Sequence, residues 1–122
     1  EAPPKAETAA PAANDLASLM RRGRQQQSSG DLEGAYATFG DAVTRYPGNR
    51  DAVQQRDAAK AALIRSYDRE GTQAFPRQNL DLAIAKWDRI LELDPGNQKA
   101  ALERERALDL KKKMNEKFGT TN

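Results

Sequence analysis

The sequence predicts an all-α fold of antiparallel helix–turn–helix repeats, with about five helices of which two are long. Three observations lead to this prediction. The chain repeats itself after 48 residues, apolar residues recur at steps of three and four, and no run alternates between apolar and polar residues as a strand would. Only 6% of the residues are aromatic, so we expect a lean core filled largely by alanine and leucine between helices.

The repeat is seen by aligning residues 16–63 with residues 64–111, which requires no gap. Thirteen of the 48 aligned positions are identical, whereas chance would give roughly three or four. A fixed period of this size is typical of stacked helical repeats.

The first two predicted helices form a hairpin. Asn14 and Asp15 can both cap the first helix, over residues 16–28. Gly30 stops that helix, and Asp31 caps a second helix over residues 32–45. Both helices therefore begin at a residue whose side chain can accept a backbone hydrogen bond.

The third predicted helix is unusually long. A Pro-Gly-Asn turn at residues 47–49 precedes it. From Arg50 to about Phe75, no residue except Gly71 interrupts a helix, and Pro76 ends it.

The last two predicted helices repeat this arrangement. Asn79 caps a helix over residues 80–93, whose apolar residues fall on one face. The Pro-Gly-Asn turn recurs at residues 95–97. A second long helix follows over residues 98–118, and Gly119 terminates it.

The two ends of the chain differ from the helical domain expected over residues 14–119. Residues 1–13 are rich in alanine and proline and contain no large apolar side chain, so we expect a disordered tether there and a short disordered tail at residues 120–122. Such tethers are common after a removed signal peptide or lipid anchor, or between envelope domains. A neutral linker is the alternative.

Small, aromatic and proline residues recur at matching positions in both copies. They are Leu19, Gly23, Ala35, Phe39 and Pro47 in the first copy, and Tyr67, Gly71, Ala83, Trp87 and Pro95 in the second. This pattern resembles the tetratricopeptide repeat, W-x2-L-G-x2-Y followed by A-x3-F and a proline. The resemblance implies an α-solenoid in which glycine and alanine let helices approach closely, the aromatic fills the space between repeats, and proline ends the second helix.

The sequence departs from the family pattern in three ways. The interval is 48 residues instead of about 34, so we expect the first helix of the second copy to be longer by about four turns. Arg22 and Glu70 stand where the family prefers leucine, and Gln26 and Ala74 where it prefers an aromatic, which weakens packing. Only two full motifs are present, so the last helix is expected to act as a cap.

The composition argues against catalysis. The chain has no histidine and no cysteine, which removes imidazole and thiolate chemistry and zinc sites of the Cys/His type. Nucleotide-binding and hydrolase motifs are absent as well. We therefore expect no enzyme, no metal and no cofactor. The 20 basic and 18 acidic residues do not predict a nucleic-acid binder, and no apolar stretch is long enough to span a membrane.

Two features have ordinary structural explanations. Trp87 could stack on a ligand, but its place in the repeat pattern favours a core position. Asp109 and Lys113 lie one turn apart and predict a surface ion pair. The basic run at residues 111–113 is favourable near the C-terminus of a helix.

Basic residues recur on the helix that the resemblance places along a concave groove, where tetratricopeptide proteins hold extended peptides or partner helices. An arginine guanidinium can donate two parallel hydrogen bonds to a carboxylate. We therefore expect an acidic peptide, a C-terminal carboxylate or an acidic partner surface to bind, and a solvated basic face without a partner is the alternative. The expected partner-binding residues are Arg21, Arg24, Arg65, Arg69, Lys113 and Lys117.

The favoured function is a protein-binding adaptor in a bacterial envelope assembly, in the periplasm or lipid-anchored through a removed N-terminus. A cytoplasmic location is the alternative. A module for self-association, as a homodimer or within a larger protein, is the second hypothesis, because two motifs provide a short core. Binding of an anionic polymer is a third, which the interleaved acidic residues disfavour.

Overall fold

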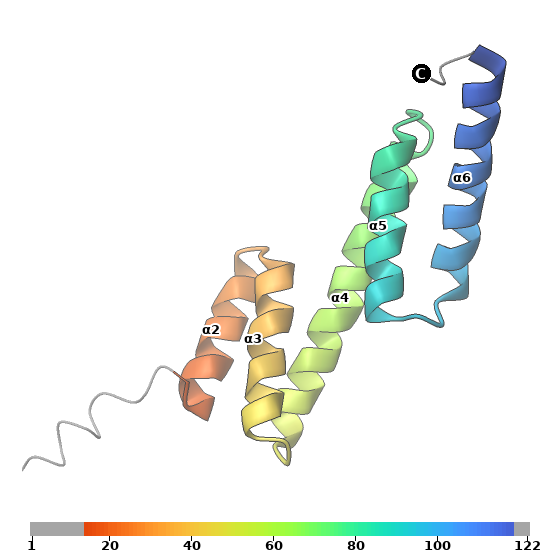
Figure 1. Cartoon of the computed structure of the whole chain (residues 1–122). Coiled ribbons are helices and arrows are strands. Elements are labelled where there is room, and N and C mark those ends of the chain that lie inside the picture. Colours follow the sequence, from red (N-terminus) through yellow and green to blue (C-terminus); the bar gives the residue numbers. More distant parts are fainter. Residues whose placement is uncertain (1–13, 119–122) are drawn as a thin grey trace, which may run out of the picture. The chain divides into compact units, whose positions relative to one another are not determined.

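The computed structural model describes residues 14–118. The expected tether at residues 1–13, the tail at 120–122 and the helix stop at Gly119 lie outside the described residues. Within the described part the chain forms five helices and no strand (Figure 1), which confirms the all-α prediction. The helices are α2 (Leu16–Ser28), α3 (Leu32–Arg45), α4 (Arg50–Ala74), α5 (Leu80–Leu93) and α6 (Gln98–Phe118).

The helix boundaries follow from local side-chain chemistry. Each of the five described helices starts after an Asp or Asn whose side-chain oxygen accepts a hydrogen bond from a backbone amide three residues on, which satisfies a donor that the helix leaves free. The bonds are Asp15–Ser18 at 2.8 Å, Asp31–Gly34 at 2.9 Å, Asn49–Ala52 at 2.8 Å, Asn79–Leu82 at 3.4 Å and Asn97–Ala100 at 2.9 Å. The predicted boundaries match, except that α4 ends at Ala74, one residue before the expected end.

The chain divides into two compact units between Leu63 and Ile64. This is the boundary between the two aligned copies of the sequence. The first unit holds α2, α3 and the first half of α4, and the second holds the rest of α4 with α5 and α6. Each copy of the 48-residue repeat therefore forms a unit of three helical segments, and not a helix pair alone.

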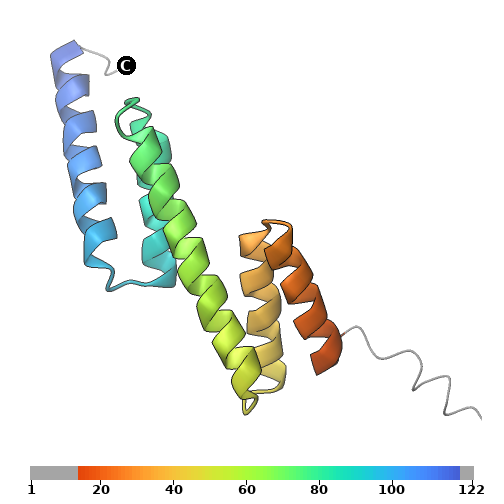
Figure 2. The ribbon, with the colours of Figure 1, turned by 180° about the vertical axis from the view of Figure 1, so that it is seen from behind.

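The first unit has a continuous apolar core. In Figures 1 and 2, α2 and α3 lie side by side and run in opposite directions. Buried Leu19 of α2 and Phe39 of α3 belong to the same cluster as Ala52 and Ala59 of α4. The residues that exceed the usual repeat length thus do more than lengthen the next helix. They close the core of the first unit.

The aromatic ring of the first unit packs on its glycine. A Cβ atom built on Gly23 would lie 2.5 Å from Cε1 of Phe39, closer than two carbon atoms can approach. Phe39 and Ala35 are fully buried. The Phe39 ring lies against α2, where the absence of a glycine side chain leaves room, and it belongs to the same cluster as Ala52 and Ala59 of α4.

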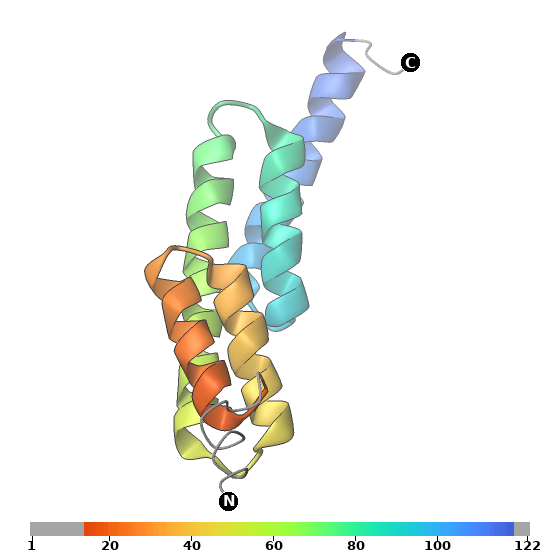
Figure 3. The same ribbon diagram turned by 90° about the vertical axis from the view of Figure 1, so that its left-hand side faces the viewer.

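The second unit repeats this packing with a larger ring. A Cβ atom on Gly71 of α4 would lie 2.9 Å from Cε2 of Trp87 on α5, and Figure 3 shows this part of α4 beside α5. The Phe75 ring lies 6.1 Å from the Trp87 ring, centroid to centroid. The core of this unit is completed by the buried residues Tyr67, Ala74, Leu80, Ala83, Ile90, Ala100 and Ala107.

Two of the residues assigned to the repeat core are not part of it. Pro47 and Pro95 are exposed, each in the turn that follows the second helix of its unit. Their role is to stop α3 and α5, since proline lacks the backbone N–H that the next helical turn needs.

Candidate functional site

Arg21 and Arg24 lie together on the surface of the first unit. Both belong to α2 and are exposed. With Gln25, Ser28 and Ser29 they line a shallow depression of about 430 Å³. The Arg21 guanidinium is 3.3 Å from the hydroxyl of Ser18, and neither arginine forms an ion pair within residues 14–118.

Arg65 and Arg69 form a second pair, one turn apart on the part of α4 that belongs to the second unit. Both are exposed, and no carboxylate of the described chain is within ion-pair distance of either. Arg21 and Arg69 occupy the same position in the two aligned copies. We call Arg21 with Arg24, and Arg65 with Arg69, the arginine pairs; other exposed arginines are present in both units, and Arg21 and Arg69 are the two members of the pairs at equivalent positions.

The two lysines predicted to bind a partner are already engaged. Nζ of Lys113 is 3.0 Å from a carboxylate oxygen of Asp109, the surface ion pair that the sequence predicts. Nζ of Lys117 lies 5.7 Å from the centre of the Phe118 ring, which is a cation–π distance. Both lysines are exposed on α6; the charge of Lys113 is offset by Asp109, whereas the ring contact leaves the charge of Lys117 in place.

Other charged residues join neighbouring helices of the second unit. Lys99 of α6 donates a hydrogen bond of 2.8 Å to Asp68 of α4, and Arg104 of α6 pairs with Asp88 of α5. The hydrogen bond to Asp68, helped by the attraction between the two charges, raises the pKa of Lys99 above its usual 10.5. These pairs hold helices together at the surface, where each contributes little to stability.

Trp87 occupies a core position. Only 1% of its surface is exposed, and its indole Nε1 has no hydrogen-bond partner within the described residues. A Cβ atom on Gly71 would lie 3.0 Å from this nitrogen, so the N–H edge faces the α4 backbone. The alternative of an exposed stacking platform is not what the structure shows.

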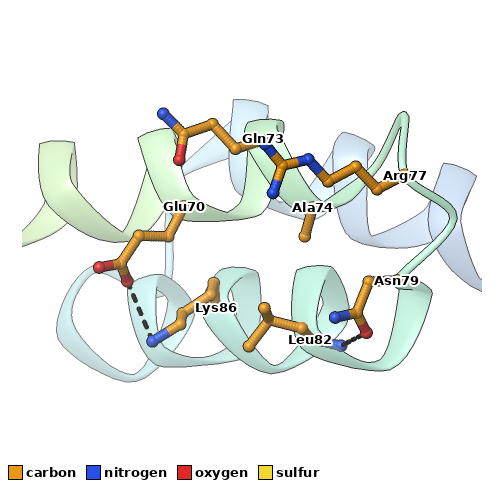
Figure 4. Close-up of a pocket in the computed structure, with 7 residues that line it drawn as sticks. All are labelled: Glu70, Gln73, Ala74, Arg77, Asn79, Leu82 and Lys86. Atoms are coloured by element: carbon orange, nitrogen blue, oxygen red, sulfur yellow. Dashed lines mark hydrogen bonds and ion pairs between the residues drawn. The ribbon is translucent and has the colours of Figure 1, made fainter.

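A pocket of about 330 Å³ lies between α4 and α5 in the second unit (Figure 4). Its α4 side is formed by Glu70, Gln73 and Ala74. Arg77 and Asn79 of the connecting loop, together with Leu82 and Lys86 of α5, complete the lining. Glu70 and Lys86 form an ion pair of 3.0 Å across one end of the pocket, and the Asn79 side chain caps α5 at the other.

No motif of the sequence marks this pocket. Its one available signal was the contrast between Gln26 and Ala74 at equivalent positions, which appeared only as a departure from the family pattern. A pocket depends on which side chains meet across two helices, and the helical period of one segment does not contain that information.

Within the described chain, no cluster of three or more residues of the metal-binding types is placed to hold an ion. None of the helices over residues 14–118 is long and apolar enough to cross a membrane. Comparisons with protein-family models, curated proteins and solved structures found no match to this chain.

Proposed function

We propose that this chain is a protein-binding scaffold of the tetratricopeptide kind that binds acidic segments of a partner protein through its arginine pairs. The observation that carries the proposal is the equivalence of the two units. Both bury an aromatic ring on a glycine of the first helix, and both leave arginine exposed at the same position of that helix, at Arg21 and at Arg69.

The chemistry of arginine supports an acidic partner. A guanidinium is charged at any physiological pH and presents planar N–H donors that match a carboxylate. Because no ion pair within residues 14–118 occupies the arginine pairs, a partner carboxylate would not need to displace one. A binding role without catalysis also agrees with a sequence that lacks histidine and cysteine.

A place in a bacterial envelope assembly is a further part of the proposal. It rests on the Ala/Pro composition of residues 1–13 alone. Periplasmic and lipid-anchored settings both agree with that composition, and so does a linker inside a cytoplasmic protein.

Self-association is the second candidate function. It is favoured by large apolar side chains exposed on α6, where Leu102 is 58% and Phe118 is 65% exposed. A second copy of the chain could cover them. Sedimentation equilibrium at high micromolar concentration decides this, because a clean monomer excludes the function.

The proposed function is tested by reversing the charge of the arginine pairs. Binding of a fluorescent glutamate-rich peptide is measured by anisotropy, with a glutamine-rich peptide as the ligand control. We expect the quadruple variant Arg21→Glu, Arg24→Glu, Arg65→Glu, Arg69→Glu to bind at least about tenfold more weakly, since each exposed charge contact contributes up to about 1 kcal/mol.

The matched control reverses arginines that already have intramolecular partners. The control variant Arg45→Glu, Arg106→Glu alters exposed arginines that pair with Asp41 and Glu103. It has the same net charge as a variant in which only one arginine pair is reversed, so these two variants are compared directly. If the control variant lowers the affinity for the peptide as much as reversal of one arginine pair does, binding reflects net charge only and the proposed site is wrong.

A further inference from the structure

The pocket between α4 and α5 has a filled counterpart in the first unit. There the side chain of Gln26 on α2 reaches α3, where its Oε1 accepts a 2.7 Å hydrogen bond from the hydroxyl of Thr38. Its Nε2 would lie 2.8 Å from a Cβ atom on Gly34. The amide of Gln26 thus lies over Gly34 and fills the space between the two helices.

The second unit has different residues at all three of these positions. The alignment pairs Gln26 with Ala74, Gly34 with Leu82, and Thr38 with Lys86. All three of the replacements line the pocket. Since Ala74 is too short to cross to α5, the space that a glutamine side chain fills in the first unit is left open in the second.

The charge of the open pocket is unbalanced. It is lined by two cations, Arg77 and Lys86, and by one anion, Glu70. Glu70 is already paired with Lys86 at 3.0 Å. Arg77 is exposed and has no ion-pair partner in the part of the chain that the structure describes. Figure 4 shows its side chain on the α4 side of the pocket, opposite Leu82 and Lys86.

The apolar part of the lining suits an aliphatic stem. Ala74 is buried, whereas Leu82 is 41% exposed, a high value for a leucine beside a pocket. Covering this part of Leu82 with CH₂ groups removes apolar surface from water, which favours binding. A ligand that fits therefore combines a short hydrocarbon stem with a negative charge.

We infer that this pocket, which we call the α4–α5 subsite, takes one glutamate side chain of the acidic partner, so the inference rests on the proposed function and adds to it. Glutamate has the shape of the glutamine that fills the first unit. Its carboxylate replaces the amide because the second unit offers the cation Lys86 where the first offers the hydroxyl of Thr38, and the cation Arg77 lines the same pocket. Its stem lies between Ala74 and Leu82.

The test uses the full chain and an alanine-rich peptide in which a single glutamate is the only charged residue, titrated by ¹H–¹⁵N NMR. Peptides with glutamine or aspartate at that place are the ligand controls. We expect saturable shifts of the Ala74, Leu82 and Lys86 amides with the glutamate peptide, and weaker binding of both controls. Shifts confined to other residues, or equal binding of the glutamine peptide, overturn the inference.

Three variants are expected to change the affinity for the single-glutamate peptide, two by lowering it and one by raising it. Arg77→Gln removes the unpaired cation and should lower the affinity for the glutamate peptide about tenfold, as expected for loss of a hydrogen bond to a charged group. Glu70→Gln removes the competing anion and should raise this affinity roughly twofold, which is the size of an exposed charge effect. Ala74→Gln places in the pocket the side chain that fills the first unit, and binding at the subsite should be lost.

Circular dichroism and thermal unfolding establish that each variant is folded. Arg77 and its substitution lie at the surface, so this variant decides the matter even if Ala74→Gln fails to fold. If both Arg77→Gln and Glu70→Gln leave the affinity of the single-glutamate peptide unchanged, the subsite assignment is wrong.

The two proposals fail in different ways. If binding of the glutamate-rich peptide still depends on the arginine pairs but the single-glutamate peptide does not shift the amide signals of the subsite, only the subsite assignment is wrong. If the single-glutamate peptide saturates the subsite while charge reversal of the arginine pairs has no effect, the proposed function of those pairs is wrong and the subsite stands.

Discussion

Gly23 and Gly71 allow close packing between two helices of each unit, because their missing side chains make room for the rings of Phe39 and Trp87. The atoms nearest to a Cβ on either glycine belong to the ring of the next helix. These rings are almost fully buried and cannot swing out to solvent. Glycine normally weakens a helix by about 1 kcal/mol relative to alanine, so its presence here reflects the gain from close packing.

Replacing either glycine by alanine should therefore destabilise the protein. We expect Gly23→Ala and Gly71→Ala each to lower the free energy of unfolding by roughly 1–2 kcal/mol, because overpacking costs more than the gain in helix propensity. Urea unfolding followed by circular dichroism measures this.

Gly40 provides the matched control within α3. A Cβ atom there would meet nothing within 4 Å, so Gly40→Ala should stabilise the protein by about 0.5–1 kcal/mol. The account of the glycine–ring packing is contradicted if all three substitutions change the stability in the same direction.

At the scale of elements, the hairpin turn of each unit has the same backbone but different side chains. Gly30 and Gln78 are aligned in the two copies, and both have a left-handed backbone, with φ of 87° and 60°. Glycine adopts this conformation freely, whereas other L-residues adopt it at a cost of about 1–2 kcal/mol. The α4–α5 turn is therefore strained at a position where the α2–α3 turn is not.

This difference predicts a stabilising substitution. Gln78→Gly should raise the free energy of unfolding by about 0.5–1 kcal/mol, the relief of strain minus the greater freedom of glycine in the unfolded chain. Thermal and urea unfolding measure it, with Gln78→Ala as the control that keeps the Cβ atom and should change little. A loss of stability in Gln78→Gly would show that the side chain of Gln78 matters more than its backbone.

The helices themselves were predictable because their signals are local. An Asp or Asn, a Pro-Gly-Asn turn and a three- or four-residue apolar period mark each element within a few residues of where it occurs. The buried Gly, Ala and aromatic residues of the repeat were predictable as well, since they recur at a fixed interval.

Features that depend on contacts between elements were not predictable in this way. The sequence indicates that residues 50–63 are helical, but not that Ala52 and Ala59 close the core of the first unit. In the same way, the sequence shows that Ala74 is small, but not that a pocket remains beside it. The closed core and the pocket both depend on which face of a helix packs against which neighbouring helix. The apolar period of a single helix does not determine that packing.

At the scale of the whole molecule, the chain contains two copies of one three-segment unit, and α6 extends past the end of the second copy at Lys111. Leu63 and Tyr67 of α4 are buried, whereas their counterparts on α6 are the exposed Lys111 and Asn115. Polar residues at positions that the preceding copy buries are typical of the capping end of a repeat array. This agrees with the expectation that the last helix acts as a cap.

The equivalence of the two units is the claim on which the proposed function depends, and nuclear Overhauser spectroscopy of the full chain tests it most directly. We predict strong cross-peaks from the Gly23 Hα protons to the Phe39 ring and from the Gly71 Hα protons to the Trp87 indole, with both glycines shifted upfield by the ring currents. Glycine shifts near random-coil values without these cross-peaks, in either unit, would contradict the account.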